Sequence, residues 1–113
     1  MIKVKILIVD DELDFCMLME NYFTEKGYDA FIASTLLDGM RLLEKIKPAI
    51  VFLDNNLPDG EGWTKVKEII TAYPELNVNL ISAYGVKPEL GMDSGNIRFW
   101  EKPISADQLD AIF

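Results

Sequence analysis

The chain has 113 residues, half of them hydrophobic, which is typical of one compact globular domain with a buried core. Nineteen acidic residues against eleven basic ones give a net charge of −8, which argues against direct nucleic-acid binding because phosphate backbones require a basic surface. No apolar run is long enough to cross a membrane, and the absence of His with a single Cys leaves carboxylates, hydroxyls, lysine or a hard metal ion for any chemistry.

Five apolar runs typical of strands alternate with segments of helical spacing. The expected strands are residues 5–10, 29–33, 49–53, 78–82 and 97–100. The expected helices are residues 13–26, with Phe15, Leu18, Met19 and Tyr22 on one side, a segment from Leu36 to Ile46 capped by Ser34 or Thr35, a segment from Trp63 to Tyr73, and a last helix capped by Ser105 with Gln108 in the capping box. Gly39 lies inside the second helix, where we expect close packing against the sheet to compensate for its low helix propensity.

A strand followed by a helix, repeated five times, predicts an α/β fold with a parallel sheet and right-handed crossovers. One segment fits this pattern poorly. Residues 85–96 contain Pro88 and three glycines, which disfavour a helix. We therefore expect the fourth helix to be short, distorted or absent.

Polar residues stand at the ends of four of the expected strands. They are Asp10, Asp11 and Glu12 after the first, Asp54 after the third, Ser82 at the end of the fourth and Lys102 after the fifth. Because ligands of parallel sheets bind beyond the carboxyl ends of the strands, these side chains should meet at one edge. Clustered carboxylates repel one another unless a hard divalent cation such as Mg²⁺ joins them. Together with a hydroxyl and a lysine, they indicate phosphoryl transfer to a carboxylate.

Each of these residues also has a simpler explanation. The acidic run after the first strand could cap the following helix and favour its dipole. Ser82 could be an ordinary hydroxyl at a strand end, and Phe99 could be a core residue. The hypothesis of a functional site rests on all four strand ends being polar in the same chain.

From Lys5 to the end, the sequence resembles the receiver domain of response regulators. The resemblance is carried by the Asp10–Asp11 pair, by residues 54–62 with the sequence DNNLPDGEG, by Ser82–Ala83 and by Lys102–Pro103. Any one of these motifs occurs often by chance. All four, in this order and at the ends of expected strands, are specific for the receiver domain. The resemblance implies a flavodoxin-like, doubly wound five-stranded parallel sheet with strand order 2-1-3-4-5.

The resemblance also implies the chemistry of Asp54. This residue would accept a phosphoryl group from a histidine kinase, a phosphotransfer protein or a small phosphodonor. Asp11 and Asp54 would bind Mg²⁺ directly together with the backbone carbonyl of Asn56, and Asp10 would act through a metal-bound water.

Further positions match the family's switch. Lys102 and Ser82 would each hold a phosphate oxygen, and Phe99 would move inward as Ser82 vacates its space. Asn56 and Tyr84 match positions that tune how fast the phosphoryl group is lost.

The resulting hypothesis is a signalling switch that catalyses only its own phosphorylation and dephosphorylation and is not otherwise an enzyme. Its partners would be the phosphodonor and an output domain or partner protein, with homodimerisation on phosphorylation left open. A phosphorylation-independent interaction module remains an alternative. A phosphatase of the aspartyl-phosphate type is disfavoured, because Asn56 stands where such enzymes place a general acid.

The setting of the protein follows from composition and chain length. A single Cys suits a reducing compartment, so we expect a cytoplasmic location without a membrane or nucleic-acid contact by this domain. We interpret residues 1–113 as one receiver domain. Its last helix ends early at Phe113, so either the chain is trimmed from a longer protein, which we favour, or this helix is minimal.

Overall fold

The computed structural model of the chain describes residues 2–83 and 96–113. Five parallel strands form its central sheet in the order β2-β1-β3-β6-β7, which confirms the expected order of the five long strands. They are β1 (Lys5–Val9), β2 (Asp29–Ala33), β3 (Ile50–Asp54), β6 (Asn77–Ser82) and β7 (Ile97–Glu101). The short strands β4 (Asn56–Leu57) and β5 (Gly60–Glu61) pair as an antiparallel hairpin beyond β3.

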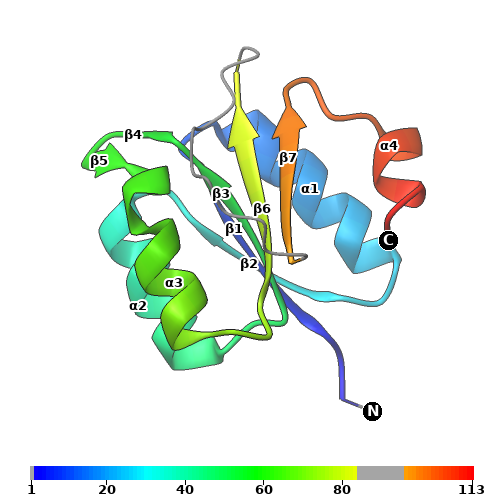
Figure 1. Cartoon of the computed structure of the whole chain (residues 1–113). Coiled ribbons are helices and arrows are strands. Elements are labelled where there is room, and N and C mark those ends of the chain that lie inside the picture. Colours follow the sequence, from blue (N-terminus) through cyan, green and yellow to red (C-terminus); the bar gives the residue numbers. More distant parts are fainter. Residues whose placement is uncertain (1, 84–95) are drawn as a thin grey trace.

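Helices cover both faces of the sheet, with α1 and α4 on one side and α2 and α3 on the other (Figure 1). Their bounds are α1 (Leu13–Glu25), α2 (Leu36–Ile46), α3 (Val66–Ala72) and α4 (Ala106–Asp110), and a 3₁₀ turn η1 (Gly62–Lys65) leads into α3. The inner strands β1 and β3 are therefore buried along almost their whole length, which explains their continuous apolar sequence. In the described part of the chain, no helix has the length and apolar character that a membrane span requires.

Local sequence signals account for the first residues of α2 and α4. Thr35 accepts a hydrogen bond from the backbone of Asp38 and caps α2, and Ser105 forms the expected capping box with Gln108. A Cβ atom on Gly39 would lie 2.8 Å from a methyl group of Val9, so the expected close packing of this glycine on the sheet is confirmed.

One expectation about the helices is only partly met, and another falls on residues that the structure does not describe. Of the residues expected on one side of α1, Phe15 and Met19 are buried against the sheet and Tyr22 is half-buried, but Leu18 is 56% exposed. The buried side of α1 also carries Cys16 and Phe23. The expected irregular fourth helix falls almost entirely on residues 84–95, which lie outside the described residues.

A buried polar pair joins β6 to β7 in the core. Asn79 is fully buried in the middle of β6, where its amide nitrogen donates to the carbonyl oxygen of Val51 at 3.2 Å. Its amide oxygen accepts a 2.8 Å hydrogen bond from the indole nitrogen of Trp100. Trp100 also packs against Phe52 and Phe113 on the side of the sheet covered by α1. Satisfying both ends of the amide makes a buried asparagine tolerable in a central strand.

This pairing predicts an energetic coupling between the two residues. Trp100→Phe should lower the free energy of unfolding by about 1–3 kcal/mol, because it leaves the buried amide oxygen of Asn79 without a donor. In an Asn79→Leu background the same change should cost less, since that oxygen is already gone. Urea denaturation of the wild type, the two single variants and the double variant measures this coupling. Strictly additive losses of stability would contradict it.

Candidate functional site

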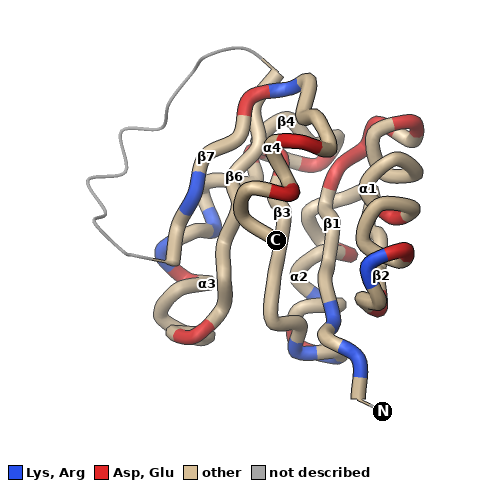
Figure 2. Tube along the Cα trace, turned by 90° about the vertical axis from the view of Figure 1, so that its right-hand side faces the viewer, with Lys and Arg blue, Asp and Glu red and all other residues tan. Residues whose placement is uncertain are grey.

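Three carboxylates meet where β1 and β3 end. Asp10 and Asp54 are 1% and 5% exposed, and Asp11 beside them is exposed. Oxygen atoms of all three lie within 4.8 Å of one another. Figure 2 shows acidic residues at the end of the molecule where β1 finishes and the loop with β4 lies. The sheet therefore brings together the acidic residues that the sequence placed on separate strand ends.

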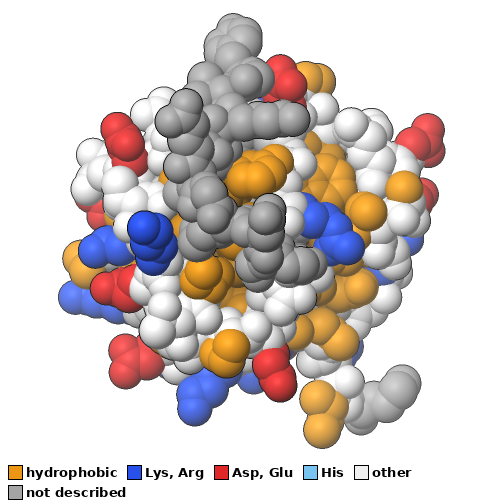
Figure 3. Space-filling view, viewed as in Figure 1, with side chains coloured by type: hydrophobic (Ala, Val, Ile, Leu, Met, Phe, Trp, Pro, Cys, Tyr) orange, Lys and Arg blue, Asp and Glu red, His pale blue; other side chains and the backbone are white. Residues whose placement is uncertain are grey.

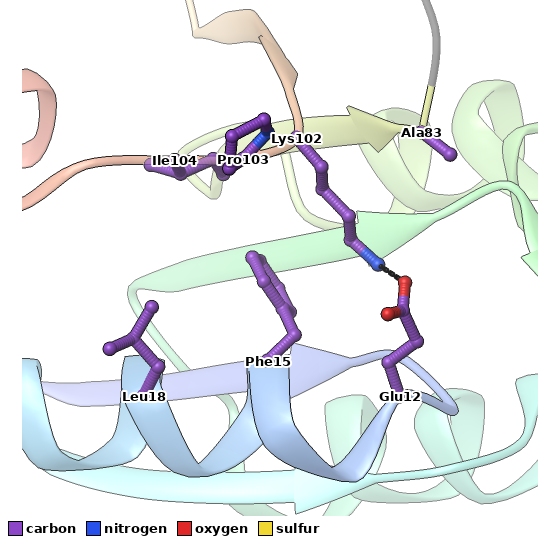
Figure 4. A pocket seen from close by; sticks show the side chains of 7 residues that line it. All are labelled: Glu12, Phe15, Leu18, Ala83, Lys102, Pro103 and Ile104. Atoms are coloured by element: carbon purple, nitrogen blue, oxygen red, sulfur yellow. Dashed lines mark hydrogen bonds and ion pairs between the residues drawn. The ribbon is translucent and has the colours of Figure 1, made fainter.

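Lys102 follows the edge strand β7, and its side chain extends toward this cluster. Its backbone nitrogen donates to the carbonyl oxygen of Ser82 at 2.8 Å, just beyond the paired ends of β6 and β7. Its Nζ lies 2.8 Å from Oδ2 of Asp10 and 2.6 Å from Oε1 of Glu12. The same ammonium group stands 4.5 Å from the centre of the Phe15 ring, a cation–π arrangement. Figure 4 shows Lys102 reaching across the sheet edge toward Glu12.

Burial controls the ionisation of the site. It raises the pKa of Asp54 from 3.8 to about 6, and the charge of Asp10 adds to this effect against the opposing influence of Lys102. Burial also raises the pKa of Asp10, although Lys102 counteracts it. For Lys102, burial alone would lower the pKa, but the bonds with Asp10 and Glu12 outweigh it, so the pKa is raised. Asp54 therefore stays ionised at neutral pH, but at an energetic cost.

The donor set fits a hard divalent cation. Asp10 Oδ2 is buried and receives no hydrogen bond of suitable geometry, although Lys102 Nζ is nearby. Carboxylate oxygens from three residues within reach of one another are the ligands that Mg²⁺ prefers. Asn56, whose carbonyl was the fourth expected ligand, follows Asp54 by two residues in β4. A bound cation would relieve the repulsion between the two buried carboxylates.

The single thiol of the chain, that of Cys16, has a structural role beside the site. Cys16 is buried beneath Asp10, and its Sγ donates to the backbone oxygen of Asp10 at 3.2 Å. Burial raises the pKa of Cys16 to about 12. The thiol therefore stays protonated and helps to anchor the start of the acidic cluster.

The loop after β3 folds back onto the backbone of Asp54. Gly62 donates its N–H to the carbonyl oxygen of Asn55 at 3.0 Å, and the Asn55 side chain accepts from the N–H of Trp63 at 3.1 Å. A Cβ on Gly62 would overlap the carbonyl oxygen of Asp54, so only glycine permits this approach. The indole of Trp63 donates to the carbonyl oxygen of Leu53 at 3.2 Å and closes the loop.

The same loop is tied to α2 by a contact that the sequence did not predict. Both carboxylate oxygens of Asp59 accept hydrogen bonds from backbone N–H groups at the start of α2, those of Leu36 at 2.7 Å and Leu37 at 2.9 Å. These bonds lower the pKa of Asp59. A carboxylate at a helix N-terminus is favourable, but no local pattern reveals a cap supplied from 22 residues away.

The expected switch residues lie beyond the acidic cluster. Ser82 is half-buried at the end of β6. Phe99 in β7 is 46% exposed, and its ring meets the Trp63 ring edge-on at 6.5 Å between centroids. Phe99 thus stands in an outward position here. Tyr84, the expected tuning position, lies outside the described residues.

Comparison with known proteins identifies the family and the fold of the chain. The family model described as "Response regulator receiver domain" matches residues 6–113. The chain is 30% identical to sporulation initiation phosphotransferase F of Bacillus subtilis, across 99% of this chain and 93% of the relative. A CheY-like response regulator receiver domain protein from Methanospirillum hungatei shares the fold, with a TM-score of 0.85, 22% identity, and coverage of 97% of this chain and 90% of the other. NtrX from Brucella abortus is 30% identical with a TM-score of 0.78, and the match covers 98% of this chain but 25% of NtrX.

The buried carboxylate predicts a pH-dependent change in stability. Asp54 is nearly buried and its pKa is 3.8 in the unfolded chain but about 6 in the fold. The folded state therefore holds the proton more tightly, and stability falls as the pH rises from about 4 through about 6. Asp54→Asn removes this loss. Without Mg²⁺, we expect it to raise the free energy of unfolding by about 3 kcal/mol near pH 7.5 but by only about 1 kcal/mol near pH 4.5.

Urea titrations of both proteins at the two pH values measure this difference. Asp29→Asn, at the start of β2, is the control and should show no such dependence. An Asp54→Asn protein no more stable than the wild type at neutral pH would contradict a raised pKa for this carboxyl group.

Proposed function

Because the chain belongs to the response regulator receiver domain family, we propose that it is a phosphorylation-dependent switch in which Asp54 accepts the phosphoryl group. The observation that carries this proposal is the meeting of three carboxylates and a lysine at the ends of β1, β3 and β7. Asp54 is the natural nucleophile of the set. It stands at the middle of the sheet edge, whereas Asp10 is engaged by Lys102.

In the transfer, a carboxylate oxygen of Asp54 forms a bond to phosphorus while the bond from phosphorus to the donor breaks. The bonding electrons leave with the donor, as a histidine nitrogen or as acetate when acetyl phosphate is the donor. With a pKa of about 6, Asp54 is ionised at neutral pH and needs no base to remove a proton. The product is an acyl phosphate on Asp54.

We propose that the acidic cluster holds Mg²⁺ through Asp11, Asp54 and the backbone carbonyl of Asn56, with Asp10 acting through water. When bound, the cation supplies positive charge that offsets the charge of the phosphoryl oxygens. Asp10 also anchors the ammonium group of Lys102, which lies 2.8 Å away. Lys102 is the residue of this chain that can pair with a phosphoryl oxygen from the other side.

The readout of phosphorylation would involve Ser82 and Phe99. Ser82 stands at the end of β6, next to β3 and β7 in the sheet, where its hydroxyl would bond a phosphoryl oxygen. Phe99 is outward and half-exposed, so it would have to turn inward to occupy the space vacated by Ser82. Figure 3 shows hydrophobic side chains on the face presented by β6 and β7. An inward Phe99 would change this face and so signal the phosphorylated state to an output domain or partner protein.

The phosphodonor would approach beside α1. Leu13, Met17 and Leu18 are each more than half exposed on this helix. Leu18 also lines a pocket with Phe15 and Ile104 next to Lys102. An apolar surface at the rim of the site suits a helix of a histidine kinase or phosphotransfer protein. Docking there would bring a phosphohistidine to Asp54.

Incubation with Mg²⁺ and acetyl phosphate tests the proposed function. Intact mass should increase by one phosphoryl group, and tryptophan fluorescence should change because Trp63 contacts Phe99. Asp54→Asn should abolish both signals, whereas Asp29→Asn at the opposite end of the sheet should keep them. EDTA should prevent phosphorylation if the reaction requires the cation.

A wild-type protein that gains no phosphoryl group under these conditions would refute the switch and favour a phosphorylation-independent interaction module. Phosphorylation that persists in Asp54→Asn would place the acceptor elsewhere.

A further inference from the structure

The ammonium group of Lys102 is already engaged by carboxylates other than the proposed phosphoacceptor. It pairs with Asp10 at 2.8 Å and with Glu12 at 2.6 Å. In the part of the chain that the structure describes, no ion pair joins Lys102 to Asp54. A phosphoryl group on Asp54 would therefore have to take Lys102 from one of its present partners.

Among residues 2–83 and 96–113, no contact of the Glu12 side chain other than its pair with Lys102 explains its orientation. It occupies the N-cap position of α1 but makes no side-chain capping bond. Instead, its own backbone N–H donates to Oδ1 of Asp10 at 2.8 Å. Its carboxylate points across the sheet edge to Lys102, the residue it meets in Figure 4. Within the described part of the chain, the Glu12 side chain therefore bonds to Lys102 and to no other residue.

The two partners hold Lys102 in different environments. The Asp10 side chain is fully buried, whereas the Glu12 side chain is 61% exposed. A buried ion pair is strongly destabilised when one partner leaves, but an exposed one is weakened by water and salt. Glu12 is therefore the partner that Lys102 can exchange at small cost.

We propose that Glu12 is a positioning residue that competes with the phosphoryl group for Lys102 and thereby restrains phosphorylation of Asp54. This inference rests on the proposed function and adds a regulatory contact to the same site. Before transfer, Glu12 draws the ammonium group toward α1. On transfer, Lys102 keeps Asp10 and exchanges Glu12 for a phosphoryl oxygen, a change of contacts without any further covalent step.

Two substitutions separate this pairing from a general effect of charge. Glu12→Gln keeps the side-chain length but removes the charge, and Glu12→Asp keeps the charge but shortens the reach to Lys102. If Glu12 acts through Lys102, both variants should be phosphorylated by acetyl phosphate faster than the wild type, by about two- to fivefold, the range expected for an exposed ion pair. Glu61→Gln, in the hairpin opposite Asn56, is the control and should match the wild type.

A binding measurement gives a readout apart from the rate. Beryllofluoride mimics a phosphoryl group on Asp54, and its affinity in the presence of saturating Mg²⁺ can be followed by tryptophan fluorescence. Both Glu12 variants should bind it more tightly by the same factor as the rate increase. A merely structural role of Glu12 would leave this affinity unchanged or weaken it.

The outcomes distinguish this inference from the proposed function. A wild type that is never phosphorylated defeats both. A wild type that is phosphorylated, with both Glu12 variants faster and tighter, supports the competition. An increase in Glu12→Gln alone overturns it in favour of surface charge, and unchanged or slower Glu12 variants overturn it outright.

Discussion

The structure depends on two buried carboxylates, Asp10 and Asp54, which are costly to ionise at the same time. Asp10 and Asp54 are both almost completely buried at the ends of adjacent strands, and the charge of Asp10 adds to the cost of ionising Asp54. One lysine, Lys102, offsets part of this charge. The rest calls for a cation, because buried like charges without compensation are expensive. The proposed metal binding, the proposed nucleophilic role of Asp54 and the proposed control by Lys102 would all follow from this one electrostatic constraint.

The surrounding helices and loops fix the positions of these two carboxylates. β1 and β3 are fixed between two layers of helices, so the strand tips cannot move apart to relieve repulsion. The loop after Asp54 is closed by Gly62, which alone permits the approach to the Asp54 backbone, and Asp59 secures the same loop to α2. By contrast, Lys102, Glu12 and Phe99 reach the site through long or exposed side chains. A rigid acidic centre with adjustable neighbours is suited to a switch, since only the neighbours need to change partner.

The sequence predicted the strands and helices better than the side-chain contacts between them. Period and composition were sufficient to locate the strands, because a buried parallel strand such as Ile50–Asp54 has a continuous apolar sequence. Their order was implied by the resemblance to receiver domains and is confirmed. The meeting of Asp10, Asp11 and Asp54 followed from the rule for strand ends. The sequence could not predict which carboxylate pairs with Lys102, because Glu12 and Asp54 both follow strand ends on the same edge of the sheet. The structure shows that Lys102 pairs with Glu12. The burial of Asn79 was equally hidden, because its indole partner lies on another strand.

The central claim is that Mg²⁺ relieves the cost of a buried, ionised Asp54, and calorimetric titration with Mg²⁺ in buffers of different ionisation enthalpy tests it directly. With a pKa of about 6 for Asp54, binding at about pH 6 should release protons, so the observed enthalpy should depend on the buffer. Near pH 8 this dependence should vanish, and Asp54→Asn should bind Mg²⁺ more weakly without proton release at either pH. Binding at about pH 6 whose enthalpy is independent of the buffer, or an undiminished affinity in Asp54→Asn, would contradict the account.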